Sequence, residues 1–508
     1  MIEHYSLMKA KQVLPLLCVL ALLVCSCKIG LGDYPSDPDI TVVKDVQRKQ
    51  FWAFNYRTSQ YYQVTANLYV EGRHCKIWVE QETDVSSADA KNVANIFDSR
   101  IYPKMMDTFG IYGDMSVNGD IVAHNTMELA DWLGDRDGKL AILLLNIQDK
   151  YEQGINESRT TGYFSSSDLL ASRSHSNGTD MLYIDINPEK PGSEESNKTI
   201  AHEMQHLMNF VTSTLLRKDD TVHEMDTWIN EGLSAMAEWV YSGKHSEARW
   251  VYYNADPSGL IQRGNNFFVW GNHTNEHQYA ELDDYATVYL FFHWLRLQAG
   301  NNRIFSNMIS SNEYNYRAVT QAAGKAINKT IYGDWETLLK TWLAANYINA
   351  QSGYYGYRND RTLREIKAKT VSEGTHRIQL YPGEGVYSVT MDEFPWPGEG
   401  NYIKYVGLAS KSPWINNNAT FPDGALLTYN VNQNEHGSPE EGITSGISSH
   451  IDTTFYERRI RALLSQRTVI DASGILRSYQ HDEAPDPAMA GAVTVPVMET
   501  VLGIIKLE

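Results

Sequence analysis

The sequence predicts an α+β protein, because strand patterns and helix patterns occupy successive parts of the chain. Residues 51–190 mix period-two alternation with a helical stretch, and residues 227–350 show mostly helical spacing. After about residue 360, Pro and Gly become frequent and short strand patterns recur. We therefore expect a mixed β/α and helical domain over 51–360 and a β-rich accessory domain over 361–508.

The start of the chain has the layout of a bacterial targeting segment. Two lysines precede an apolar run over 13–24, which is shorter than the stretch of about 20 residues that a membrane-spanning helix takes. A small residue stands directly before Cys27, which resembles the lipobox of bacterial lipoproteins. The pattern predicts a lipoprotein signal peptide over 1–26 and lipidation of Cys27. An ordinary cleaved signal is the alternative, and Cys25 is a poorer lipid acceptor.

Residues 27–50 are expected to form a tether, because glycines and prolines interrupt regular structure there. The predicted location is the bacterial cell envelope, with a lipid anchor in the membrane and the folded part facing the periplasm or the exterior. The formal net charge of −18 over 508 residues argues against nucleic acid as a partner. Cys75 lies in an apolar strand pattern, so we expect it to be a buried core thiol.

The first expected elements are a hairpin and a helix. Residues 62–70 and 75–79 alternate with period two around a turn at 71–73. Residues 86–109 show helical spacing, with Ser86 or Ser87 as a possible cap. Further strands are expected over 140–145, 181–186, 385–391 and 426–431, and further helices over 283–298 and after a cap at Asp334.

A pair of histidines at helical spacing occupies the middle of the chain. His202 and His206 are four residues apart, so a helix would place them on one face with Glu203 at its border. Two imidazoles can hold a zinc ion that keeps an open position, and a nearby carboxylate can accept a proton from water. The neighbouring apolar residues favour a helix that Ser196 or Asn197 would cap. The alternative is a helix in which these residues occur together by chance.

A zinc site with two histidines needs a third protein ligand, commonly a Glu from a second helix. Glu231 is the candidate, because it lies in an amphipathic segment soon after the histidines. The small residues Gly232, Ser234 and Ala235 would let a neighbouring helix approach closely.

These two segments resemble a known family. Residues 201–210 and 228–234 resemble the active-site helix and the ligand-bearing helix of the hyicolysin family of bacterial neutral metallopeptidases, within the gluzincin clan. Residues 72–79 and 181–185 look like its flanking strands. The resemblance covers roughly residues 64–349 and implies a gluzincin-like fold.

The resemblance also implies an activity for residues 51–360, namely zinc-dependent hydrolysis of peptide bonds inside a protein or peptide substrate. It implies one catalytic Zn²⁺ held by His202, His206 and Glu231. Glu203 would be the general base that accepts a proton from the attacking water.

The sequence offers several candidates for the residues that would support this chemistry. Some gluzincins place an Asp four residues after the glutamate ligand, but that position is Ala235 here, and Glu238 could substitute. Such enzymes also use a Tyr or His to stabilise the oxyanion. The candidates are Tyr285, Tyr289, His223 and His293, and the sequence does not choose among them.

Three segments complete the expected surroundings. Residues 151–180 are polar and long for a connection, so we expect a loop that borders the active site. In metallopeptidases of this kind a strand near the zinc helix offers its edge to the substrate, which assigns that role to residues 181–186. Asp135 and Asp137 could hold a structural Ca²⁺, although a plain turn over 134–138 is the favoured interpretation.

Two other functions fit the same sequence. One is a surface-binding lipoprotein, an adhesin built on a peptidase scaffold, since a fold does not fix a function. The other is a metal-dependent hydrolase with a substrate other than protein. The presence of all three expected ligands together with Glu203 argues against an inactive scaffold, and so against the first alternative. Bound zinc, and casein cleavage that a chelator abolishes, would distinguish a peptidase from the second.

Overall fold

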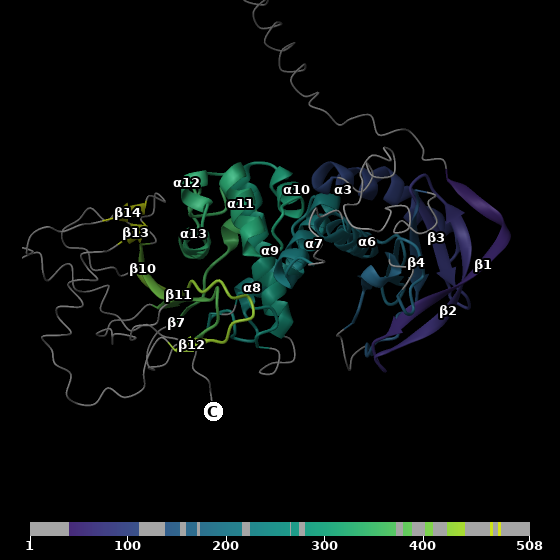
Figure 1. Ribbon diagram of the computed structural model, residues 1–508, viewed down its shortest axis with the longest axis horizontal. Helices are drawn as coiled ribbons and strands as arrows, with labels where there is room; N and C mark the ends of the chain where they lie inside the picture. Colours follow the sequence, from purple (N-terminus) through teal and green to yellow (C-terminus); the bar gives the residue numbers. More distant parts are fainter. Residues whose placement is uncertain are drawn as a thin grey trace, which may run out of the picture.

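The computed structural model describes most of the chain between residues 40 and 441, with two short strands beyond. The described ranges are 40–110, 138–152, 159–169, 173–215, 224–264, 266–273, 280–371, 379–388, 402–409, 424–441, 468–470 and 476–478. Within them the protein is mixed α+β, with one sheet at each end of its long axis and a body of helices between the sheets (Figure 1).

The first sheet has the strand order β1-β2-β3-β4-β6-β5. Its strands are β1 (Thr41–Asn55), β2 (Gln60–Glu71), β3 (Cys75–Glu80), β4 (Leu140–Leu145), β5 (Gly162–Phe164) and β6 (Met181–Asp185). The expected hairpin is confirmed as the antiparallel pair β2 and β3, and β3, β4 and β6 run parallel to one another. Cys75 is a buried free thiol, as expected, and burial raises its pKa.

Two expectations for this sheet are wrong. Residues 41–50, placed in the tether, belong to β1 and pair with β2. The strand was missed because its side chains there are mostly exposed, so no apolar alternation marks it. The strand over 181–186 is also not a free edge, because β6 pairs with β4 on one side and β5 on the other.

The helix expected over 86–109 is present but divided into α2 (Ser87–Ile96), a π-helical turn η1 (Phe97–Ile101) and α3 (Tyr102–Phe109). Ser86 caps it, as expected, by accepting a hydrogen bond from the backbone N–H of Asp89. Pro103 near the start of α3 has no N–H to donate, which accounts for the break in the regular helical hydrogen bonds.

The helical body follows the first sheet. It consists of α6 (Glu194–Asn209), the π-helical turn η3 (Phe210–Leu215), α7 (Thr227–Ser242), α8 (Glu247–Ala255), α9 (Ala280–Ala299), α10 (Arg303–Ile309), α11 (Tyr316–Ala326), α12 (Lys329–Tyr332) and α13 (Trp335–Ile348). The expected cap is confirmed at Asp334, whose side chain accepts from the N–H of Thr337. Among the described helices, none combines the length and the apolar character needed to cross a membrane.

The described strands after residue 360 form a second sheet of order β14-β13-β10-β11-β9-β7 and a small pair, β12 with β8. They are β7 (Thr370–Val371), β8 (Gln379–Leu380), β9 (Gly385–Ser388), β10 (Ile403–Ala409), β11 (Gly424–Asn430), β12 (Glu440–Glu441), β13 (Thr468–Ile470) and β14 (Leu476–Ser478). Their core is continuous with that of the helices, since Tyr387, Leu427 and Tyr429 belong to the main hydrophobic cluster.

This continuity is reinforced by polar contacts. The Tyr387 hydroxyl donates to the backbone carbonyl of Leu343 in α13 at 2.7 Å. The fully buried Glu384 accepts from the side chain of Asn272 at 2.7 Å. The predicted division at 360/361 therefore separates two styles of secondary structure that share one core.

Several expectations lie outside the described residues. These are the signal peptide over 1–26, Cys27, Asp135, Asp137 and His223.

Candidate active site

Helix α6 carries the two histidines on the face opposite its apolar stripe. Ser193 caps it by accepting from the N–H of Ser196, with two glutamates in the first turn near the positive end of the helix dipole. The start is therefore earlier than the expected caps, Ser196 and Asn197, which lie inside the first turn and are buried. Ile200, Met204 and Leu207 are buried against the core, which turns His202 and His206 outward from it.

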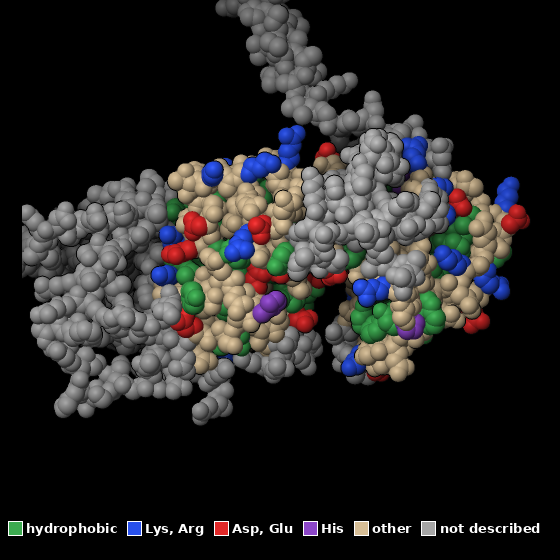
Figure 2. Space-filling model, viewed as in Figure 1, with side chains coloured by type: hydrophobic (Ala, Val, Ile, Leu, Met, Phe, Trp, Pro, Cys, Tyr) green, Lys and Arg blue, Asp and Glu red, His purple; other side chains and the backbone are tan. Residues whose placement is uncertain are grey.

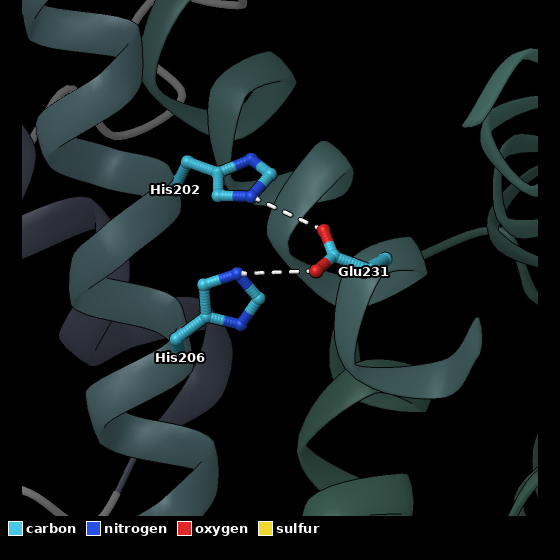
Figure 3. Close-up of side chains that lie close together, drawn as sticks. All are labelled: His202, His206 and Glu231. Carbon is cyan, nitrogen blue, oxygen red and sulfur yellow. Dashed lines mark ion pairs between the residues drawn. The ribbon is translucent and has the colours of Figure 1, made fainter. Parts of the chain in front are cut away.

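Helix α7 lies against α6 and brings Glu231 to the histidine pair. One carboxylate oxygen of Glu231 lies 3.4 Å from Nε2 of His202, and the other lies 3.8 Å from Nε2 of His206. Figure 3 shows both imidazoles pointing from one helix toward this carboxylate on the other. The nearest nitrogen and oxygen atoms of the three side chains lie within 4.8 Å of one another.

The far nitrogen of each imidazole has its own partner. Nδ1 of His202 lies 2.8 Å from Oε1 of Glu238, the residue expected as a substitute for the missing Asp. Nδ1 of His206 lies 3.1 Å from the hydroxyl of Ser234, which donates its hydrogen to Gln205 at 2.6 Å. Because Glu238 accepts and Ser234 has already donated, both Nδ1 atoms carry the hydrogen, and each Nε2 is directed at Glu231.

The electrostatics of this cluster suit a cation. Burial alone would raise the pKa of Glu231, but the imidazoles of His206 and His202 lower it to about 2. Burial alone would lower the pKa of His202, but Glu231 and Glu238 raise it to about 10. The Oε2 atom of Glu231 is buried without a hydrogen-bond donor. Zinc prefers imidazole nitrogens and carboxylate oxygens as ligands. The two Nε2 atoms and the Glu231 carboxylate supply this donor set, so the residues fit a zinc ion.

Glu203 lies beside this cluster and is 7% exposed. Burial, together with the nearby charge of Glu231, raises its pKa, which the imidazoles and a hydrogen bond from the N–H of Phe164 partly oppose. Strand β5 can approach this closely because Gly162 has no side chain. A Cβ there would stand 2.6 Å from Cγ2 of Thr199 and 3.3 Å from Cγ of Glu203.

A cavity of about 350 Å³ contains all four predicted site residues. Its lining comes from β5, α6, α7 and Tyr285 of α9, and includes Asn209, Ser213 and Met225. Figure 2 shows the molecule hollowed between the part with the first sheet and the helical body. The expectation that residues 151–180 border the site is confirmed, but this segment is not a plain loop, because it contains β5.

The structure separates the candidates for oxyanion stabilisation. Tyr285 lines the cavity, and burial followed by the charge of Glu231 raises the pKa of its hydroxyl. Tyr289 does not line the cavity, because its hydroxyl bonds Nδ1 of His245 at 2.9 Å and accepts from the N–H of Ser246 at 3.0 Å. His293 is buried against Tyr289 and Trp239, also away from the cavity. The geometry therefore favours Tyr285 over Tyr289 as the candidate, and the role itself remains a prediction.

Two supporting groups were missed from the sequence. The Ser234–Gln205 pair orients His206, and Asn209 donates to the side chain of Asn230 beside Glu231 at 2.6 Å. Helical spacing could have identified Ser234 as a supporting residue, because it is three residues after Glu231 and shares its face. The expected close approach at Gly232 is present as well, although the ring that occupies it is Phe292 of α9.

The chain is similar to a characterised protein. It is 28% identical over 334 residues to the neutral metalloprotease ShpI of Staphylococcus hyicus, an alignment that covers 64% of this chain and 68% of that protein. No protein-family model matches the chain. With the ligand geometry described above, this similarity supports a metalloprotease family for the chain.

Proposed function

We propose that this protein is an extracytoplasmic zinc endopeptidase that hydrolyses peptide bonds in protein or peptide substrates. The observation that carries the proposal is the convergence of His202, His206 and Glu231 beside the buried carboxylate of Glu203. The similarity to ShpI supports it, because a neutral metalloprotease generally uses zinc.

The proposed mechanism assigns a role to each residue of the cluster. His202, His206 and Glu231 would hold the zinc ion, which lowers the pKa of a water molecule and polarises the scissile carbonyl. Glu203 accepts the proton of the attacking water and delivers it to the leaving nitrogen. Its raised pKa suits the first step, because such a carboxylate takes up a proton more readily than an ordinary one.

The other residues position these groups. Glu238 and Ser234 hold the imidazoles of His202 and His206 with each Nε2 directed inward. Tyr285 lines the cavity, and its hydroxyl hydrogen-bonds Glu231; in the proposed mechanism it would donate instead to the developing oxyanion.

A lipid-anchored adhesin is the rival function. It requires no proton acceptor and no ordered partners for the imidazoles. The described cluster has both, since Glu203 faces the same cavity as the three donors and each Nδ1 is engaged. A cavity organised in this way supports hydrolysis over adhesion alone.

Casein hydrolysis by the purified protein tests the proposal. Activity should be lost after treatment with a zinc chelator, should return when zinc is added, and should persist with inhibitors of serine and cysteine proteases. Metal content measured beside activity should show about one zinc per chain, as a site with three protein ligands holds a single ion. A zinc-loaded protein that cleaves neither casein nor a diverse peptide mixture would contradict the proposal.

A further inference from the structure

A second cavity adjoins the candidate active site. It has a volume of about 240 Å³ and shares Tyr163 and Phe164 of β5 with the first cavity. The β1–β2 hairpin supplies half of the remaining lining, so we call it the hairpin cavity. These residues are Ala53, Phe54, Tyr56 and Tyr61, and the other half consists of Ser165, Asp168, His175 and Tyr183. The mechanism proposed above makes no use of it.

The walls of the hairpin cavity are largely aromatic. The rings are those of Phe54, Tyr56, Tyr61, Tyr163, Phe164 and Tyr183, together with the imidazole of His175, which stacks on Tyr61 with ring centroids 4.6 Å apart. They brace one another, with ring centroids 5.3 Å apart for Phe54 and Tyr61, and 4.1 Å apart for Tyr163 and Tyr183. The hydroxyl of Tyr163 also accepts from the N–H of Phe54 at 3.0 Å, which ties the hairpin to β5. The cavity is therefore preformed, and its lining suits an apolar group.

The one carboxylate in the lining is already engaged. Asp168 is 1% exposed, accepts from the N–H of Asn177 at 2.8 Å through one oxygen, and accepts from the hydroxyl of Tyr183 at 2.7 Å through the other. A cationic side chain entering the cavity would find this carboxylate committed. The lining consequently favours an uncharged aromatic or large aliphatic group over Lys or Arg.

A peptide bound along β5 could reach both cavities. Within the described residues β5 ends the first sheet, pairing with β6 alone. An extended peptide beside β5 would advance about 3.3 Å per residue and direct alternate side chains to opposite sides. Because Tyr163 and Phe164 line both cavities, a side chain in the hairpin cavity would belong to a residue close to the one beside Glu203.

We propose that the hairpin cavity is a specificity subsite that binds an aromatic or large aliphatic side chain of the substrate, within a few residues of the scissile bond. This inference rests on the proposed peptidase function and adds a substrate class to it. Recognition would come from apolar burial between the hairpin rings and β5.

Cleavage-site profiling with a diverse peptide mixture tests the inference. The zinc-loaded wild type should show aromatic or large aliphatic residues enriched at one position near the cleaved bond. Phe54→Ala and Tyr61→Ala should reduce the ratio of kcat/KM for a Phe-containing peptide to that for its Ala analogue by about tenfold, the usual scale for a lost apolar contact. Tyr61→Phe should keep the ratio, because it retains the ring.

Tyr402→Ala is the matched control, since Tyr402 is 45% exposed and Tyr61 is 43% exposed. It should leave the ratio unchanged, and thermal melting of every variant checks folding. Hydrolysis without enrichment at any position, or with Lys or Arg enriched at the position that Tyr61→Ala affects, would overturn the subsite while leaving the peptidase function intact. A zinc-loaded wild type that cleaves no peptide would overturn both.

Discussion

The side chain of Glu203 offers the sharpest test at the level of single residues. Glu203→Gln keeps the shape of the buried side chain but cannot accept a proton, so we expect kcat to fall by about a hundred- to ten-thousand-fold. Zinc content and thermal melting should match those of the wild type, because Glu203 is not among the three converging donors. A variant with near-normal turnover would show that another group is the base.

Three glutamates near the cavity should differ in their effect on zinc. Glu231→Ala removes a converging donor and should abolish stoichiometric zinc binding. Glu238→Ala removes only the partner of His202 Nδ1, so we expect zinc affinity to drop by about 10- to 100-fold. Glu224→Ala is the control, because its side chain lines the cavity but is exposed and lies outside the converging set.

Competition with a metal indicator measures these affinities. Unchanged zinc binding in Glu231→Ala, together with loss in Glu224→Ala, would move the third ligand to Glu224.

Asp168 makes stability depend on pH. Burial raises its pKa from 3.8 to about 6, against the hydrogen bonds from Tyr183 and Asn177. The folded protein therefore holds this proton more tightly than the unfolded chain, so the resulting stabilisation is complete below pH 3.8 and is lost as the pH rises through about 6.

Asp168→Asn cannot titrate and provides the comparison. The free energy of unfolding of the wild type, relative to that of this variant, should be more favourable at about pH 4.5 than at about pH 7.5. Urea unfolding at both pH values measures it. A relative stability that is independent of pH, or that falls on acidification, would contradict the raised pKa.

The residues of the zinc cluster were accessible to sequence reasoning, whereas the choice between the tyrosines was not. His202, Glu203 and His206 lie on one helix, so their relative placement follows from helical geometry alone. Tyr285 and Tyr289 are four residues apart and share a face of α9 in the same way. The packing of α9 on α7 decides which turn of α9 lies next to Glu231. Residue spacing within α9 alone does not encode this packing.

At the level of elements, the contact between β5 and α6 sets the position of the Glu203 carboxylate. Gly162→Ala would bring a methyl group to 2.6 Å from Cγ2 of Thr199 and 2.9 Å from the carbonyl oxygen of Tyr183. We expect a loss of about 1–3 kcal/mol in stability and a lower kcat/KM, because β5 must move away from Glu203.

A second substitution tests whether the steric clash with Thr199 causes these losses. Thr199→Ser removes the Cγ2 atom, so the double variant should recover part of the lost activity and melting temperature. Thr199→Ser alone serves as the control. Normal activity in Gly162→Ala would show that the closeness of β5 to α6 is unimportant for function.

Helices and strands were predictable where burial of one face produces a periodic or continuous apolar pattern in the sequence. The hairpin of β2 and β3 alternates between buried and half-buried positions, and the strand β4 is buried throughout, so both are visible in the sequence. By contrast, β5 has three residues, too few for a period, and all three are partly exposed. It exists because β6 supplies a pairing partner at a distance in sequence, which a local pattern does not encode.

At the scale of the whole molecule, the proposed lipid anchor would hold the protein at a membrane. Cys27→Ala should abolish labelling by a radioactive or alkyne fatty acid and move the protein from the detergent phase to the aqueous phase, because lipid chains bury methylene groups in the bilayer at about 0.8 kcal/mol each. Mass spectrometry of the mature N-terminus provides the direct observation. An unmodified first residue other than Cys27 would indicate a secreted protease, and retained labelling in the variant would indicate Cys25.

The contacts between α13 and β9 have a consequence for modularity. Tyr387 and Glu384 hold the strand region to Leu343 and Asn272 through buried hydrogen bonds, within one continuous apolar cluster. A chain that ended at residue 360 would expose the side of α13 that Tyr387 contacts. It would also remove Glu384, the hydrogen-bond acceptor of Asn272. The strands after residue 360 are therefore not an independently folding unit, and they should unfold together with the helices in a single cooperative transition. A chimaera that takes these strands from a related protein would also have to take α13 from it.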